Sequence, residues 1–325
     1  MILVTGGTGF LGSTLIRQLL ASGNALRAIK RRSSVIPSDL ADHPQIQWLD
    51  ADMDNYFELA DAFEGIQEVY HCAAMVSFDP SERKRMIHVN TAGTAHIVNL
   101  CIIHGARLLH VSSVAAIGVP KPGSLEASEQ NLWEYDETQN GYAISKYESE
   151  MEVWRGTVEG LNAVIINPAL IIGYQAGKAN TGAIFHLLHK GLRYYTKGSV
   201  GLVDAEDVAR VAILLMQRRD IQAERFIVSN ENWTYQKLFS TCARLMRKPA
   251  PNKLATRLHL GIAWRAAKVA SWFTGVKPGL TKETAHAALV KQAYTNKKLT
   301  ERVGYAFKPL ECTLKEICEG LERKA

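Results

Sequence analysis

Residues 2–12 read ILVTGGTGFLG, a short apolar run followed at once by three glycines spaced three apart. The apolar run predicts a strand that is buried on both faces, and the glycines predict a tight turn into a helix. Gly6 and Gly9 would let the backbone approach a ligand closely, and Gly12 would let the helix pack against the strand. The free N–H groups and the dipole at the start of that helix favour an anion, so a pyrophosphate is the expected occupant. The spacing differs from the GxGxxG of dinucleotide dehydrogenases, which leaves a glycine-rich turn without a ligand as the alternative.

The size and charge of the chain set broad limits on its class. With 325 residues, of which 47% are apolar, the chain can bury a large core and form one large α/β unit or two lobes. We interpret its 38 basic and 32 acidic residues, a net charge of +6, as spread over the whole length, which suits an anionic cofactor better than nucleic acid. The most basic local cluster, Lys30, Arg31 and Arg32, is short and lacks interleaved aromatic residues, so no nucleic-acid partner is expected.

Cysteine usage and hydropathy bear on the cellular compartment. The five cysteines are scattered without CxxC spacing, so neither a metal site nor a disulfide framework is expected. The first strand would begin at residue 2, which leaves no room for a signal peptide, and no uninterrupted apolar run approaches the length that crosses a bilayer. We therefore expect a cytoplasmic location.

The second expected strand ends where a dinucleotide-binding fold holds the adenosine ribose. A helix over 13–22 leads to this strand at 25–29, and Lys30, Arg31 and Arg32 follow it. An acidic residue there would bond the 2′-hydroxyl of NAD, whereas a basic one would bind the 2′-phosphate of NADP. We predict NADP bound through Arg31 and Arg32, with NAD as the other cofactor that the site could take. A solvated basic turn is the alternative.

Two further strand ends are candidate cofactor contacts. The strand at 46–49 ends just before Asp52, whose carboxylate could accept from the adenine amino group, although an exposed loop carboxylate needs no function. Residues 69–74 form another strand that finishes in Ala73 and Ala74. Small side chains there would let the backbone pass close to the cofactor phosphates and ribose.

The strongest catalytic signal is a serine pair followed by a YxxxK motif. A strand at 108–113 carries Ser112 and Ser113 at its carboxyl end, the edge where doubly wound sheets bind their ligands. About thirty residues later Tyr142 and Lys146 open a helix, four residues apart and therefore on one face. Lys146 can then lie beneath the Tyr142 ring and the cofactor ribose. Alone, YxxxK would indicate a surface tyrosine beside a routine lysine; after the serine strand and the glycine turn it indicates catalysis.

Together these motifs resemble the short-chain dehydrogenase/reductase superfamily. The resemblance is to its extended branch, the NAD-dependent epimerase/dehydratase family, and to the dihydroflavonol-4-reductase-like members of that branch. The matching segments are TGGTGFLG at 5–12, HCAA at 71–74, VNTAGT at 89–94, VSSVAAIG at 111–118, YAISK at 142–146 and NPALIIG at 167–173, together with Asp52. They cover about the first two thirds of the chain in consistent order and spacing.

The resemblance implies a Rossmann-type doubly wound parallel sheet with a smaller, mostly helical C-terminal substrate lobe. It implies catalysis by Ser113, Tyr142 and Lys146, an NAD(P) cofactor, and a small-molecule carbonyl or alcohol substrate, with no metal ion. The implied cofactor contacts are Gly6, Thr8, Gly9, Phe10, Leu11, Gly12, Arg31, Arg32, Asp52, Met53, Ala73, Ala74, Asn90, Ser112, Tyr142, Lys146, Pro168 and Leu170. A homodimer formed through helices that flank the sheet is expected on the same basis.

We divide the chain into two parts. A nucleotide-binding domain covers 1–170 and is completed by 200–229, and a substrate lobe covers 171–199 and 230–325. Within these parts, residues 173–199 look loop-rich, and 201–207 begin a segment that resembles a family motif and returns to the main sheet. Residues 225–229 form the final strand.

An amphipathic helix is expected over 254–273. Its apolar face consists of Leu254, Leu258, Ile262, Val269 and Phe273, with Lys253, Arg257, Arg265 and Lys268 interspersed and Trp264 and Trp272 nearby. This pattern suits an interfacial helix, which could contact a membrane, or a substrate lid. A helix packed on its own protein is the alternative that we favour.

The expected chemistry centres on the tyrosine. A phenol with an ordinary pKa of about 10 is a poor base at neutral pH. We expect the Lys146 ammonium and a positive nicotinamide ring to lower the pKa of Tyr142, so that it exchanges a proton with the substrate oxygen. Ser113 would hydrogen-bond the same oxygen, and Ser112 is its rival because alternation along a strand lets only one of them face the site. Hydride would pass to or from C4 of the nicotinamide.

Three functions remain open. The first is an NADP-dependent reductase of a ketone or aldehyde, or the reverse oxidation. The second is an NAD-dependent sugar-nucleotide epimerase, which would need a diphosphate clamp, with Arg244, Arg247, Lys297 and Lys298 as unpatterned candidates. The third is a non-catalytic NADP-binding regulator, which the tyrosine–lysine pair counts against.

Overall fold

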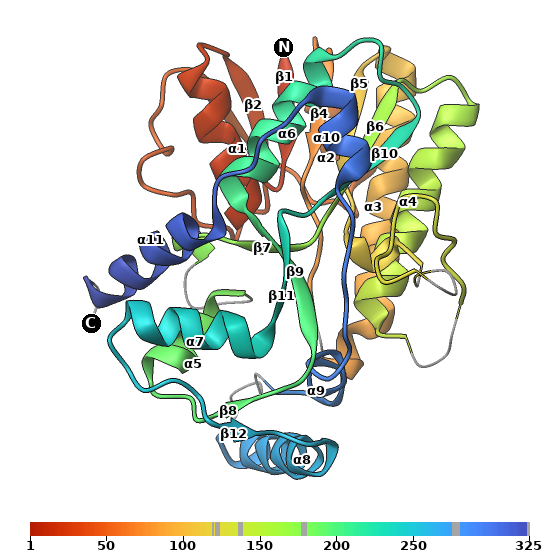
Figure 1. Ribbon diagram of the computed structural model, residues 1–325. Helices are drawn as coiled ribbons and strands as arrows, with labels where there is room; N and C mark the ends of the chain where they lie inside the picture. The colour runs from red at the N-terminus through yellow and green to blue at the C-terminus, as the bar shows by residue number, and fades with distance from the viewer. Residues whose placement is uncertain are drawn as a thin grey trace.

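Seven parallel strands form the central sheet of the computed structural model, which describes residues 1–77, 79–118, 120, 124–135, 139–176, 181–274 and 280–323 (Figure 1). For Gln175 and residues 272–274 it describes the backbone alone. The strands of this sheet are β1 (Ile2–Thr5), β2 (Leu26–Lys30), β3 (Ile46–Asp50), β4 (Glu68–His71), β5 (Arg107–Val111), β6 (Ala163–Pro168) and β10 (Glu224–Val228). Their order is β10-β6-β5-β4-β1-β2-β3, and every neighbouring pair is parallel.

The strand order reverses between β1 and β4. The chain first moves outward from β1 through β2 to β3, and then returns to place β4 on the other side of β1. Doubly wound sheets bind their ligands at such a reversal, outside the carboxyl ends of the strands. The glycine turn after β1 lies at this point.

Helices cover both faces of the sheet, as a sheet of buried parallel strands requires. One face carries α1 (Phe10–Ala21) and α6 (Ala205–Gln217), and the other carries α2 (Tyr56–Asp61), α3 (Arg83–His104) and α4 (Gly141–Val158) (Figure 1). Each layer has its own buried apolar cluster, with Leu15, Ile16, Val208 and Leu215 in the first and Phe63, Ile97, Leu100 and Val153 in the second. The expected doubly wound fold is confirmed.

A smaller lobe faces the carboxyl ends of the strands (Figure 1). Its strands are β7 (Leu170–Ile172), β9 (Ser199–Asp204) and β11 (Glu231–Thr234) in one sheet, and β8 (Tyr194–Tyr195) and β12 (Lys253–Leu254) in another. Its helices are α5 (Thr181–His189), α7 (Tyr235–Leu245), α8 (Arg257–Thr274), α9 (Lys282–Ala287) and α11 (Leu310–Glu322), while α10 (Lys297–Val303) returns to lie beside β10. Short 3-10 turns lie at η1 (Pro80–Glu82), η2 (Val114–Ala116) and η3 (Tyr174–Ala176). The lobe is mostly helical, as expected.

One detail of the expected chain path is wrong. Residues 173–199 are not mainly loop, because Thr181–His189 forms α5, whose Phe185 and Leu188 are buried in the core of the lobe. The segment from Gly201 does return to the main sheet, although its first part, β9, pairs with β7 and β11. It is the following helix, α6, that packs on the main sheet.

The amphipathic helix expected over 254–273 forms as α8, but its apolar face is not covered by the protein. Leu258, Ile262 and Val269 are exposed, so the alternative that we favoured, a face packed on its own protein, is wrong. The side chains of Trp272 and Phe273 lie outside the described residues.

Among the described residues, one segment, Pro80–His104, is long and apolar enough to cross a membrane by length and composition. This segment contains α3, which packs along α4. Its Ile97, Val98 and Leu100 are buried against the sheet. The helix therefore forms part of the α/β core.

Candidate active site

The glycine turn joins β1 to α1 and lies against the end of β4. Gly6 has a φ of +67°, and a Cβ placed on it would lie 2.8 Å from the backbone nitrogen of Ala73. A Cβ on Gly12 would lie 2.2 Å from the Gly6 carbonyl oxygen. Both positions therefore require glycine, because no side chain fits between the turn and its neighbours.

The start of α1 is open toward a ligand. Gly9 is the N-cap of this helix and supplies no side chain to bond its first N–H groups. It is exposed, and a Cβ there would meet only the Gly6 carbonyl oxygen, at 3.2 Å. Thr8 and Leu11 flank the opening and are half-buried. Uncapped N–H groups beside a closely packed turn fit a nucleotide pyrophosphate.

Basic and acidic side chains meet at the ends of β2 and β3. Lys30 Nζ lies 2.5 Å from Asp50 Oδ1, so this lysine is paired between the two strands. Arg32 Nη2 lies 3.4 Å from Glu58 Oε1. Arg31 is exposed and has no ion pair with the part of the chain that the structure describes. Of the three basic residues, Arg31 is thus the one most available to a phosphate group.

Asp52 and Met53 follow β3 at the same end of the sheet. The N–H of Asp52 donates to Glu58 Oε2 at 3.0 Å, while its carboxylate is exposed, where an adenine amino group could reach it. The carbonyl oxygen of Met53 lies 3.0 Å from Nδ1 of His96 on α3. These contacts fix the loop against both α2 and α3.

Asn90 on α3 ties the loop after β4 to α4. Its Oδ1 accepts from the N–H of Met75 at 2.7 Å, and its Nδ2 donates to the Met75 carbonyl at 2.9 Å and to Ser145 Oγ at 3.1 Å. Asn90 is buried, so it shapes the site by fixing this loop, which includes Ala73 and the exposed Ala74.

Ser113 follows the end of β5, and its side chain lies close enough to Tyr142, in the first turn of α4, to affect the pKa of the phenol. Tyr142 is half-buried, which leaves the pair accessible from one side. The hydroxyl of Ser112 instead donates to Glu150 Oε2 at 2.6 Å. Of the two serines, Ser113 is therefore the one beside the phenol, and Ser112 faces the core.

Lys146 lies one turn along α4 from Tyr142 and is buried. Its Nζ donates to the carbonyl oxygen of Val111 at 2.9 Å, at the end of β5. Burial lowers the pKa of Lys146 to about 8, opposed in part by Cys72 and Glu150. The ammonium is therefore present at neutral pH and close to its titration.

The pKa of Tyr142 is not lowered, although Lys146 lies one turn away on the same helix. Burial raises the pKa of Tyr142, and the side chain of Ser113 opposes this effect only in part. The expected lowering of this pKa by Lys146 is wrong for the protein by itself, because the lost hydration of the phenolate is the largest effect. The phenol therefore carries its proton at neutral pH.

A buried carboxylate that the sequence analysis does not single out holds this region together. Glu150 Oε2 accepts from Ser112 Oγ and, at 2.7 Å, from Asn167 Nδ2, which also donates to the Ser113 carbonyl at 3.0 Å. Glu150 Oε1 pairs with Nη1 of Arg225 at 3.0 Å. Glu150 thus fixes the backbone that carries Ser113.

Comparison with known proteins reveals the family. A model of the NAD-dependent epimerase/dehydratase family matches residues 2–228, and a provisionally named dihydroflavonol 4-reductase from Synechocystis is 31% identical over 308 residues, 93% of this chain and 88% of the relative. The chain belongs to the NAD-dependent epimerase/dehydratase family. A second relative, sterol demethylase protein B from Methylococcus capsulatus, is 33% identical over 267 residues, 80% of this chain and 79% of the relative.

A solved epimerase structure shows the same fold. The UDP-glucose 4-epimerase from Thermotoga maritima, solved with UDP-glucose, matches with a TM-score of 0.80 over 99% of both chains at 21% identity. The family and its reductase relatives make this chain an NAD(P)-dependent enzyme of the extended short-chain dehydrogenase/reductase type, in the dihydroflavonol-reductase-like branch. The open, glycine-lined start of α1 fits the dinucleotide on which this family depends.

In the present protein, the chain crosses from the main sheet to the smaller lobe beside the candidate site. Pro168 ends β6 and Leu170 begins β7, so the two residues bracket the crossing. A Cβ on Gly173 would lie 2.9 Å from the ring of Phe10, which shows that the glycine turn packs directly on the lobe.

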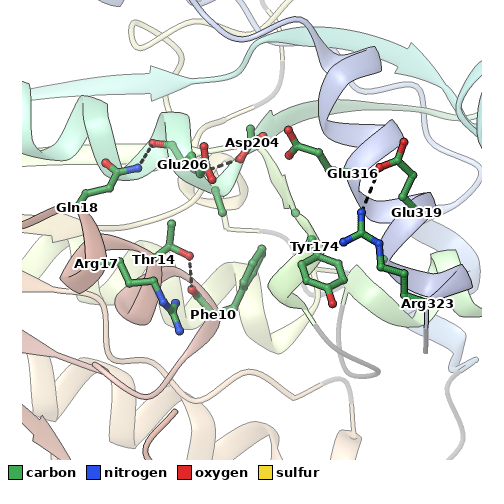
Figure 2. A pocket seen from close by; sticks show the side chains of 13 residues that line it. Phe10, Thr14, Arg17, Gln18, Tyr174, Asp204, Glu206, Glu316, Glu319 and Arg323 are labelled. Carbon is green, nitrogen blue, oxygen red and sulfur yellow. Dashed lines mark hydrogen bonds and ion pairs between the residues drawn. The ribbon is translucent and has the colours of Figure 1, made fainter. Parts of the chain in front are cut away.

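A cavity of about 320 Å³ lies between the start of α1 and helix α11 (Figure 2). Phe10 and Tyr174 line it, together with the acidic Asp204, Glu206, Glu316 and Glu319 and the basic Arg17 and Arg323. A Cβ on Gly320 would lie 1.8 Å from the Tyr174 ring, so α11 approaches this rim closely. None of the three catalytic candidates lines this cavity, which is therefore separate from them.

Proposed function

We propose that this enzyme is an NADP-dependent oxidoreductase that reduces a small ketone or aldehyde, or oxidises the matching alcohol, through Ser113, Tyr142 and Lys146. The observation that carries the proposal is that the Ser113 side chain lies close enough to the Tyr142 phenol, at the carboxyl edge of the sheet, to oppose the rise in its pKa. Two adjoining hydroxyl groups, accessible from one side, can hold one substrate oxygen between them.

The protonation states favour reduction. A nicotinamide bound beyond the glycine turn would supply the hydride. Because burial raises the pKa of Tyr142, its phenol is available as a proton donor to a carbonyl oxygen that gains negative charge. Ser113 would donate a second hydrogen bond to that oxygen. Lys146, held by the Val111 carbonyl, would balance the negative charge left on the phenol and bind the ribose hydroxyls.

Replacing the tyrosine tests this proposal. We expect Tyr142→Phe to lower kcat at least about 100-fold on any carbonyl that the wild-type enzyme reduces, while dinucleotide binding persists. Tyr147→Phe is the matched control, because Tyr147 lies on the same helix and stacks on Trp133 with ring centroids 4.1 Å apart. Cofactor binding without turnover of a broad carbonyl panel by the wild type would instead support a non-catalytic regulator.

The preference for NADP depends on Arg31 in this proposal. Arg31 is exposed beside the ribose end, whereas Lys30 and Arg32 already face carboxylates. We expect tighter binding of NADPH than of NADH, and we expect Arg31→Ala to weaken NADPH about tenfold while leaving NADH unchanged. Fluorescence titration of both nucleotides decides this, and tighter NADH binding in the wild type would overturn it.

The positions of the basic residues favour the reductase over the epimerase. Lys297 and Lys298 lie on α10, where Lys298 Nζ is 2.9 Å from Glu224 at the amino end of β10. Arg244 lies on α7, 3.4 Å from Glu311, and Arg247 follows the same helix. The four candidates therefore lie on two distant elements and do not form a diphosphate clamp (Figure 1).

The arrangement of domains and copies is part of the same proposal. Residues 1–170 and 200–229 would bind the nucleotide, and 171–199 and 230–325 would bind the substrate in a cytoplasmic enzyme. A homodimer would form through the outer faces of α3 and α4, which share a groove of about 450 Å³ lined by Ile87, Ala92 and Ala95 among others. Light scattering on the purified enzyme tests the dimer.

A further inference from the structure

The basic residues of the chain are not spread evenly. This differs from the interpretation, based on the overall composition, that the charge is spread over the whole length. Residues 232–282 contain ten of the 38 Lys and Arg and none of the 32 Asp and Glu. The remainder of the chain holds more acidic than basic residues, so this one segment accounts for the whole positive net charge. Helix α8 lies in its middle.

Helix α8 lies at the edge of the lobe farthest from the main sheet (Figure 1). Its 18 residues make a rod about 27 Å long at 1.5 Å per residue. Leu260, Trp264 and Ala267, which fall on one side at helical spacing, are half-buried and form the side that packs on the protein.

The opposite side of α8 is an apolar stripe without a partner. Leu258, Ile262 and Val269 fall on it at helical spacing, and they are 72%, 62% and 47% exposed. A stripe of large aliphatic side chains along a helix is costly to leave in water.

Three cations lie on α8, with Arg265 beside the stripe and Arg257 and Lys268 further round the helix at helical spacing. Arg257, Arg265 and Lys268 are exposed, and none of them pairs with a carboxylate in the described part of the chain. Arg265 lies over the ring of Trp264, with its guanidinium carbon 4.6 Å from the centroid. The stripe and Arg265 thus face the same side of the molecule, and Arg257 and Lys268 lie between the stripe and the packed side of the helix.

We propose that the exposed face of α8 docks on an anionic lipid bilayer, with the apolar stripe entering the headgroup boundary and the cations contacting lipid phosphates. This combination of an exposed apolar stripe with cations and no acids characterises helices that lie in a membrane interface. The stripe distinguishes a bilayer from a nucleic acid, because aliphatic side chains gain nothing from a phosphate backbone. The absence of acidic residues from the segment distinguishes it from a second copy, because two such faces would repel each other.

Vesicle flotation of the full-length protein tests this inference. We expect the wild type to float with vesicles of phosphatidylcholine containing phosphatidylglycerol, and to bind pure phosphatidylcholine more than about tenfold more weakly. Ile262→Glu and the double variant Arg265→Glu, Lys268→Glu should each lose at least about tenfold in partitioning to the anionic vesicles. Binding of the wild type should weaken as salt is raised.

Val158→Glu is the matched control. Val158 is 90% exposed at the end of α4, away from the lobe, so the same type of change there should leave flotation unaltered. Equal thermal unfolding of the variants excludes loss of folding as the cause. No flotation of the wild type, equal flotation of Ile262→Glu, or a lipid-free dimer that Ile262→Glu dissociates would each overturn the proposal. None of these readouts depends on catalytic activity.

Discussion

Arg225 on β10 reaches across β6 to place Nη1 3.0 Å from Oε1 of Glu150 on α4. The carboxylate is fully buried, and the same arginine donates to the carbonyls of Glu129 and Asn131. One ion pair thus links the sheet edge, helix α4 and the loop that precedes this helix.

We expect Glu150→Gln to lower the free energy of unfolding by about 3 kcal/mol, because it leaves the arginine without its buried counter-charge. The variant should also move the alkaline limb of the pH–rate profile to lower pH, since Glu150 helps to raise the pKa of Lys146, which lies near 8. Urea denaturation and pH profiles measure the two effects. Glu148→Gln, on a half-buried position of the same helix, should change stability by less than about 0.5 kcal/mol.

Substitutions of the two neighbouring serines should have different effects. Ser113→Ala removes the hydroxyl beside Tyr142 that would hold the substrate oxygen, so we expect kcat to fall about 100-fold with little change in KM. Ser112→Ala removes the donor to the buried Glu150 and should cost about 1–3 kcal/mol of stability with a smaller loss of turnover. Steady-state kinetics and chemical denaturation on both variants give the comparison. A catalytic defect confined to Ser112→Ala would reverse the assignment.

Substitutions of two glycines in the turn should affect folding and cofactor binding separately. We expect Gly12→Ala to destabilise the protein by more than about 3 kcal/mol, because its Cβ would overlap the Gly6 carbonyl. Gly9→Ala should fold, since its Cβ meets that carbonyl at 3.2 Å, but it should weaken dinucleotide binding by crowding the start of α1. Thermal melts and NADPH titration check both. Unchanged nucleotide affinity in Gly9→Ala would show that the pyrophosphate lies elsewhere.

Acid should destabilise the protein through a buried histidine. Burial lowers the pKa of His71 to about 3, and its ring nitrogens lie 2.7 Å and 3.1 Å from the hydroxyls of Thr5 and Thr94. The unfolded chain therefore binds more protons than the folded protein below about pH 6.5, so stability is lost as pH falls from there toward 3. The contribution is about 1.4 kcal/mol per pH unit. We expect His71→Gln to flatten the dependence of unfolding free energy on pH between 6.5 and 4, measured by urea denaturation. The exposed His88→Gln serves as control, and an equal slope in both variants would contradict the assignment.

Local patterns predict the doubly wound fold well because many of its constraints are local. The spacing of Gly6 and Gly12 depends on backbone contacts within one turn, and the four-residue interval of Tyr142 and Lys146 is a property of any helix. The choice of Ser113 over Ser112 comes from the family resemblance, because alternation separates the two side chains without saying which one faces the site.

Long-range contacts explain the features that the sequence alone does not predict. Glu150 follows Lys146 by four residues, so the sequence did place both on one face of α4. A carboxylate in mid-helix nevertheless indicates a surface position until Asn167 and Arg225 are known to meet it. Residues 173–199, which contain α5, look loop-rich in the sequence for the same reason, because the core contacts of α5 come from α7 and α11.

The place of α11 in the lobe has a consequence for how the protein is made. This last helix supplies Leu310, Leu314 and Ile317 to the apolar cluster that also holds β7, α5 and α7. During translation those elements emerge well before the residues that complete their packing, whereas β1 to β5 find their partners early. The main sheet can therefore begin to assemble on the growing chain, but the smaller lobe must wait until α11 has been synthesised.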